Sequence, residues 1–162
     1  TKIGKIDQKY GSNIRIPPNT TSGIDNLSID LLTFKNSNNI NEPLSMLIDF
    51  RLKFLEAEKL NVEGWQWGKA STTDYGFGCK GYNRIKESAS LRNQSAQKGS
   101  EAVIILTSFI EKYPDEAKWL NISSLDAAAL DATYLKIGKD ALKDDKIIEN
   151  FCGAKAKGNL TT

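Results

Sequence analysis

The sequence has no histidine among its 162 residues. This absence excludes Ser-His-Asp and Cys-His catalytic sites, HExxH metalloproteases, histidine-ligated haem and proton transfer through imidazole. We therefore predict a protein that is not an enzyme. We assign no catalytic residue, no metal ligand and no cofactor-binding residue.

An excess of one charge sign and a long hydrophobic run are also missing. Lys and Arg total 22 against 20 Asp and Glu, so the net charge is +2. Such a balance gives no electrostatic footprint for a nucleic-acid partner. The longest aliphatic run, residues 102–106, is far shorter than the ~20 residues of a membrane span. With 40% apolar and 26% charged residues, the composition is typical of a soluble globular domain.

Cysteine is scarce, with only Cys79 and Cys152. No CxxC pair is present, which argues against a zinc site. Two alternatives stay open: two buried thiols in a cytosolic protein, or one disulfide in an exported protein. We favour a Cys79–Cys152 disulfide in a periplasmic or extracellular protein. The chain begins at Thr1 rather than Met, which fits either a removed signal peptide or a trimmed sequence. Asn-x-Ser/Thr sequons, which an Asn- and Ser-rich chain also yields by chance, occur at Asn19, Asn26, Asn93, Asn121 and Asn159.

The first part of the chain is rich in turn formers. Pro17-Pro18 and the Asn-Ser-Asn-Asn run at 36–39 favour loops. Residues 13–16 and 27–31 alternate apolar and polar side chains, as short strands do. Residues 1–41 are therefore predicted to form an irregular N-terminal segment with one or two short strands.

Helical periodicity dominates the rest of the chain. Asn41 is a good N-cap and Pro43 fits a first helical turn, while Gly138 is a natural helix stop. The fold class predicted is mainly α, with four to five helices in a single domain over residues 42–153 and a loose tail over residues 154–162. The periodic segments lie at about 41–59, 82–90, 95–113, 114–120, 124–138 and 142–152.

A segment rich in glycine and aromatic residues interrupts this periodicity at residues 61–81. We predict a loop there and name its aromatic residues as candidates for binding another protein, because Trp and Tyr supply most of the energy at interface anchors. In an extended loop, Trp65 and Trp67 would point to the same side. The alternative is that the rings pack on the helical core. The candidates are Trp65, Trp67, Tyr75, Phe77 and Tyr82.

Three motifs have catalytic or nucleotide-binding counterparts. Residues 76–81 match G-x-G-x-x-G but follow a polar turn instead of a strand, so a glycine loop around a cysteine explains them better. Residues 95–98 match S-x-x-K, which a helix start with a serine cap also explains. Residues 71–76 look like the segment around the catalytic aspartate of animal-type lysozymes, with Glu56 and Glu58 upstream. A histidine-free, carboxylate-based hydrolase is therefore one alternative function.

Three stretches of the C-terminal half share a pattern with a known family: residues 79–82, 106–116 and 127–134. In these stretches the chain resembles the Rap/Tai group of periplasmic immunity proteins of type VI secretion. The resemblance implies a small, helical, disulfide-bonded protein that blocks a cell-wall amidase by inserting a loop or a face into its site. Residues 147–152 are similar to small periplasmic acid-stress chaperones with one disulfide. We therefore expect a non-catalytic exported binding protein. The main alternative is an assembly subunit of a pilus or phage particle that uses residues 1–41 as an arm.

Overall fold

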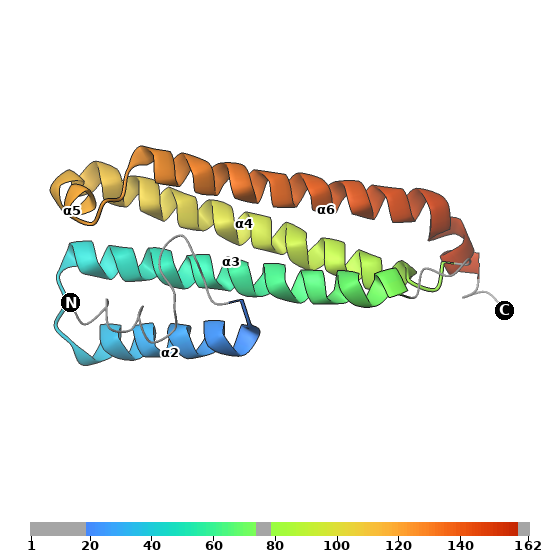
Figure 1. Ribbon diagram of the computed structural model, residues 1–162, viewed down its shortest axis with the longest axis horizontal. Helices are drawn as coiled ribbons and strands as arrows, with labels where there is room; N and C mark the ends of the chain where they lie inside the picture. The colour runs from blue at the N-terminus through green and yellow to red at the C-terminus, as the bar shows by residue number, and fades with distance from the viewer. Residues whose placement is uncertain (1–18, 74–78, 159–162) are drawn as a thin grey trace.

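The computed structural model describes residues 19–73 and 79–158, which form five helices. The helices are α2 (Thr21–Ser37), α3 (Glu42–Thr73), α4 (Tyr82–Lys112), α5 (Pro114–Trp119) and α6 (Ser124–Gly158). The long helices α3, α4 and α6 run side by side with α4 in the middle, α2 lies along α3, and α5 forms a corner between α4 and α6 (Figure 1). The predicted mainly helical fold is confirmed. None of the described helices is both long and apolar enough to cross a membrane.

Buried residues of the long helices recur at intervals of seven. A strict seven-residue repeat keeps one seam of a helix facing its neighbour when the helices supercoil slightly. On α4, two such lines are buried side by side, so that this helix packs against α3 and α6 at once. The lines are Ser88, Ser95, Ala102 and Phe109, and Ile85, Arg92, Gly99 and Leu106 on α4; Ala127, Tyr134, Ala141 and Ile148 on α6; and Phe50, Ala57 and Gly64 on α3.

The large apolar side chains gather toward the α5 end of the bundle. There Phe50, Phe54 and Phe109 are buried with Leu106 and Ile122. A second cluster joins α2 to α3, and a small third cluster around Ile85, Ile148 and Cys152 closes the other end. Burial of these side chains is the main favourable contribution to the free energy of folding.

The middle of the bundle is held by small residues and serine hydrogen bonds. The Ser95 hydroxyl donates to the Ala57 carbonyl, and the Ser88 hydroxyl donates to the Gly64 carbonyl, both at 2.7 Å. A serine on one helix reaches a backbone carbonyl of the next only when the two backbones pass closely. A Cβ on Gly64 would lie 2.8 Å from Arg92 Cγ, so glycine is required at that contact.

Close contact between helices at glycine also explains why two predicted helix boundaries are wrong. The loop predicted over residues 61–81 is wrong up to residue 73, because α3 continues to Thr73. Gly138 does not end a helix, because α6 runs through it to Gly158 and includes the first five residues of the predicted tail. A Cβ on Gly138 would lie 3.1 Å from Ala96 Cβ. These glycines are contact points between helices, a role that single-chain propensity does not reveal.

One of the two predicted strands is also wrong. Residues 27–31 belong to α2, and the other segment, residues 13–16, lies outside the described residues. Ile24, Leu27 and Leu31 are buried against α3 at helical spacing, whereas Ile29, which supported the alternating pattern, is 59% exposed. The predicted helix starts are confirmed at Asn41, whose side chain accepts from the Leu44 N–H at 3.1 Å, and at Pro114.

A pair of glycine substitutions tests the close packing of α4 against α6. A Cβ on Gly99 would lie 2.1 Å from the Tyr134 ring, which has no room to move because it is fully buried. We expect Gly99→Ala to lower the free energy of unfolding by about 1–3 kcal/mol. Gly138→Ala, whose Cβ meets only a methyl group, should change it by less than about 1 kcal/mol, because helix propensity offsets the crowding. Urea denaturation measures both, and equal stability of the two variants would contradict this packing.

Candidate partner-binding surface

The two predicted tryptophans lie on α3, not in a loop. Trp65 is 54% exposed and Trp67 is 45% exposed. Residues two apart on a helix point about 200° from one another, so the expectation that both share one side is wrong. Tyr75 and Phe77 lie outside the described residues. Of the aromatic candidates, Trp65 and Trp67 are therefore the ones placed with exposed rings.

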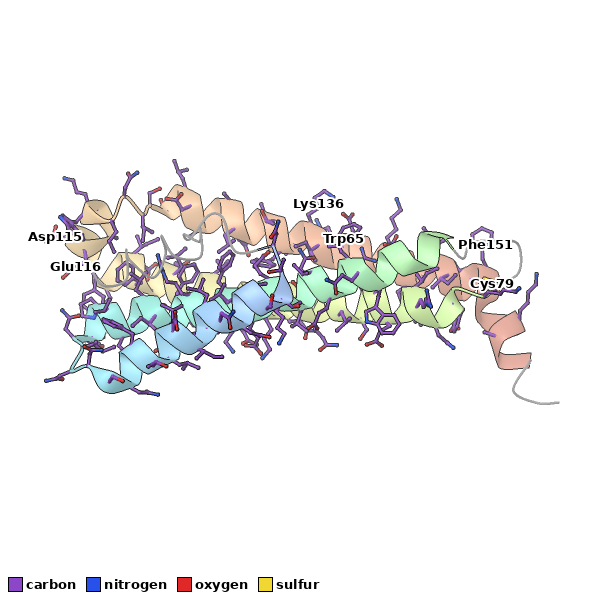
Figure 2. All side chains as sticks on the ribbon, turned by 60° about the horizontal axis from the view of Figure 1, so that its bottom comes forward. Trp65, Cys79, Asp115, Glu116, Lys136 and Phe151 are labelled. Carbon is purple, nitrogen blue, oxygen red and sulfur yellow. A yellow bond between two sulfur atoms is a disulfide. The ribbon has the colours of Figure 1, made fainter. Side chains whose placement is uncertain are left out.

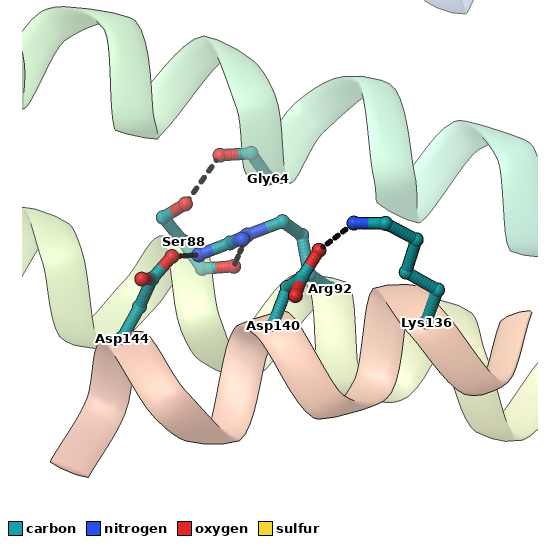
Figure 3. A network of polar contacts seen from close by, with 6 residues as sticks. All are labelled: Gly64, Ser88, Arg92, Lys136, Asp140 and Asp144. Carbon is teal, nitrogen blue, oxygen red and sulfur yellow. Dashed lines mark hydrogen bonds and ion pairs between the residues drawn. The ribbon is translucent and has the colours of Figure 1, made fainter.

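Trp65 is held in place by a buried arginine. The Arg92 guanidinium lies 5.1 Å from the centroid of the Trp65 ring. Its Nη2 donates to Asp144 Oδ2 of α6 at 2.7 Å, and its Nε donates to the Ser88 carbonyl at 3.3 Å (Figure 3). The Arg92 side chain is only 5% exposed, whereas Asp144 is 46% exposed. One cation thus joins α3, α4 and α6 beneath an exposed indole ring.

A second carboxylate of α6 stands next to this contact. Asp140 accepts a hydrogen bond from Lys136, and this bond lowers the pKa of Asp140, with a smaller contribution from the Arg92 charge. Figure 3 shows Asp140 and Asp144 one turn apart on α6, on either side of the Arg92 guanidinium. The buried cation therefore has carboxylates on the α6 side and the indole ring on the α3 side.

Tyr82 has a packing role. It is half-buried against the cluster of Ile85, Ile148 and Cys152, and its hydroxyl donates to Glu149 Oε2 at 2.5 Å. This geometry matches the alternative in which the ring packs on the helical core. Tyr82 therefore contributes to the packed core at this end of the bundle more than to the exposed surface.

The predicted pairing of Cys79 with Cys152 is present. The two cysteines are bonded through their sulfur atoms, with their Cα atoms 5.5 Å apart. The bond ties Cys79, three residues before the first residue of α4, to the last turns of α6, and it lies at the opposite end of the molecule from α5 (Figure 2). The disulfide thereby closes one end of the bundle. Trp65 and Trp67 lie on α3, the helix that precedes Cys79 in the chain.

The carboxylates considered for hydrolysis have structural partners. Glu58 accepts a hydrogen bond from the buried Tyr134 hydroxyl at 2.6 Å, and burial raises the pKa of Glu58. Burial also raises the pKa of Tyr134. Glu56 instead forms ion pairs with Lys53 and Lys98, and Asp74 lies outside the described residues. Glu56 and Glu58 therefore serve different contacts and do not converge on one cleft.

The S-x-x-K motif is likewise accounted for by packing. The Ser95 hydroxyl is buried and donates to the Ala57 carbonyl, while the Lys98 ammonium pairs with Glu56 and Glu101. The serine thus faces α3, and the lysine takes part in an ion-pair network at the surface. The first half of the G-x-G-x-x-G segment, residues 76–78, lies outside the described residues.

Sequence reasoning missed two residues of functional interest. Arg92 carries no signal in the sequence, because its burial depends on three helices meeting. Trp119, the last residue of α5, is 75% exposed, and Leu125, the second residue of α6, is 79% exposed. The sequence could have indicated that Trp119 is exposed, because this residue lies beside the Leu120-Asn121 turn and outside any periodic apolar face.

Comparison of the chain with protein-family models, curated proteins and solved structures finds no match. The function of this bundle is therefore inferred from its own side chains.

The Arg92–Asp144 pair gives an asymmetric prediction for stability. Asp144→Ala leaves a buried cation with only the flanking Asp140, so we expect a loss of about 2–4 kcal/mol in unfolding free energy. Arg92→Met leaves an aspartate that is half-exposed and can be solvated, so the loss should be about 1 kcal/mol or less. Adding Arg92→Met to Asp144→Ala should restore stability. Urea titration of the three variants measures these values, and equal losses for the two single variants would contradict the assignment.

The raised pKa of Glu58 predicts that the free energy of unfolding depends on pH. Its pKa in the folded protein is raised above the ordinary value of 4.5, so the folded state binds more protons than the unfolded state just above pH 4.5. The free energy of unfolding should therefore fall as pH rises from 4.5 through the folded pKa. Glu58→Gln keeps an acceptor for Tyr134 and should remove this fall. Glu101→Gln is the control, since the pKa of Glu101 is lowered by Lys53. Denaturation between about pH 4 and 8 measures this dependence; parallel curves for wild type and Glu58→Gln would contradict it.

Proposed function

We propose that this chain is a non-catalytic binding protein that anchors a partner protein on the Trp65 and Trp67 side chains of α3. The observation that carries the proposal is the half-exposed Trp65 ring above the buried Arg92. Large aromatic side chains dominate the binding energy of protein interfaces when they are rigid and central.

The arrangement favours binding because its cost in entropy is low. Arg92 is fixed by Asp144 and Ser88, so the face of the Trp65 ring that it covers is already restrained before a partner arrives. Pre-organised side chains lose less conformational entropy on association. The disulfide and the serine hydrogen bonds between α3 and α4 hold the supporting helices in the same way.

The finer proposal is an exported inhibitor or immunity protein that occupies a partner's site. It is supported by the absence of histidine, by a disulfide of the kind found in exported proteins, and by the resemblance to the Rap/Tai group. The competing proposal is an assembly subunit of a surface or particle. It is favoured by the exposed Trp119 and Leu125 at the α5 end, which would contact a neighbouring subunit.

Replacement of the tryptophans tests the binding proposal. We expect Trp65→Ala combined with Trp67→Ala to weaken partner binding about 30-fold or more. The unfolding free energy should fall by no more than about 2 kcal/mol, since both rings are half-exposed. The measurement is affinity capture from a periplasmic extract of the source cells with the tagged protein, followed by calorimetry with the captured protein.

Trp119→Ala is the matched control, because it removes a tryptophan from the opposite end. A protein retained by wild type and by Trp119→Ala but lost from the double variant supports the proposal. Loss through Trp119→Ala alone, together with concentration-dependent oligomers in sedimentation, would favour the assembly subunit. Identical capture by all three proteins would overturn the proposed surface.

A further inference from the structure

A second seven-residue seam runs along the outer side of α6. Its positions alternate by three and four residues, which is the spacing of a coiled-coil seam. All its members are exposed, and its three leucines are 79%, 51% and 60% exposed in chain order. This outer seam consists of Leu125, Ala128, Ala132, Leu135, Lys139, Leu142 and Lys146.

The seam differs from the inner line of α6, which faces α4. The inner line at Ala127, Tyr134 and Ala141 is buried, whereas every residue of the outer seam is exposed. A surface helix normally carries polar residues on a face that no other element covers. Leucines at seven-residue spacing, Leu135 and Leu142, are instead the pattern that a packed partner helix requires.

Charge is segregated across the same helix. The acidic side chains of its C-terminal half bond to cations or donors of α4, and the pairs are Asp144 with Arg92, Asp145 with Lys86, and Glu149 with Tyr82 and Lys86. Lys139, Lys143 and Lys146 form no ion pair with any residue that the structure describes. The outer side of α6 therefore presents leucines together with Lys139 and Lys146, which have no ion-pair partner among the described residues, whereas the charge of Lys143 acts on Asp140.

We propose that the outer seam of α6 binds an acidic amphipathic α-helix of a partner protein. The leucines supply the apolar contact, and the alanines Ala128 and Ala132 let the partner helix approach closely at one end. Lys139 and Lys146 occupy seam positions, so the partner must place carboxylates opposite them. This recognition is the helix-on-helix mode read at regular anchor positions.

Two other occupants fit the seam less well. A second copy of the chain offers no carboxylate at any seam position, so pairing of two outer seams would leave the lysines without counter-charges. A lipid surface is covered by helices with a broad apolar face, whereas here lysines interrupt a narrow seam after Leu135. The seam lies on α6 and the tryptophan surface on α3, so the two proposals stand or fall separately.

The experiment uses the full chain and a synthetic helical peptide of about 28 residues, four heptads long. The peptide carries Leu opposite the seam leucines and Glu opposite Lys139 and Lys146. We expect saturable 1:1 binding in fluorescence anisotropy. Leu135→Ser with Leu142→Ser should weaken it at least about tenfold, and Lys139→Glu with Lys146→Glu should transfer the preference to a peptide with Lys at those positions.

Ile104→Ser is the matched control, because Ile104 is 66% exposed on α4 and outside the seam; it should bind like wild type. Circular dichroism confirms that each variant is folded. Three results would each overturn the proposal: no binding of the acidic peptide, equal binding of the lysine peptide by wild type, or loss of binding in Ile104→Ser. Binding of wild type to phosphatidylglycerol vesicles but not to the peptide, or dimers abolished by Leu142→Ser, would assign the seam to a lipid surface or to a second copy instead.

Discussion

The close passage of α4 between α3 and α6 is the constraint on which the rest of this structure depends. The helices pass most closely where the residues between them are small, because the distance between packed helices depends on the side chains at the contact. Ser88 and Ser95 meet the α3 backbone through 2.7 Å hydrogen bonds, and Gly99 leaves room for the Tyr134 ring of α6. A side chain larger than these at the same positions would separate the helices and expose the apolar clusters at both ends.

Small residues contribute little apolar burial, and the bundle makes up for it in two ways. Aromatic and aliphatic side chains concentrate at the α5 end, where Phe50, Phe54 and Phe109 are buried. The opposite half relies on directed contacts: the Arg92–Asp144 pair, the Tyr82–Glu149 hydrogen bond and the disulfide. Directed contacts hold a geometry more specifically than apolar burial does, and the exposed Trp65 ring is positioned by one of them.

This packing arrangement leaves two surfaces, on α3 and on α6, that do not contribute to the core of the bundle. The acidic side chains near the end of α6 bond to cations or donors of α4, and Lys139 and Lys146 have no ion-pair partner among the residues that the structure describes. Because α3 extends well beyond α2, Trp65 and Trp67 in its C-terminal half are not covered by α2 and remain about half-exposed among the described residues. The candidate surfaces thus arise where the internal packing of α3 and α6 ends. Neither surface needs the chemistry of histidine, metal or nucleophile.

Much of the fold follows from the sequence alone. The sequence predicted the mainly helical class, the helix starts at Asn41 and Pro114, and the cysteine pairing. Each of these depends on local chemistry or on the number of residues of one type. The continuity of α3 through Gly64 and of α6 through Gly138 was not predicted, because a glycine that breaks a lone helix is a contact point in a packed one. The role of Arg92 was hidden for the same reason: whether an arginine is solvated or buried beneath a tryptophan depends on which helices surround it. Composition and residue spacing determined that the chain forms helices and where several of them begin. Only the packing of α3, α4 and α6 decided which side chains remain exposed, because the exposure of a side chain depends on neighbours that are distant in sequence.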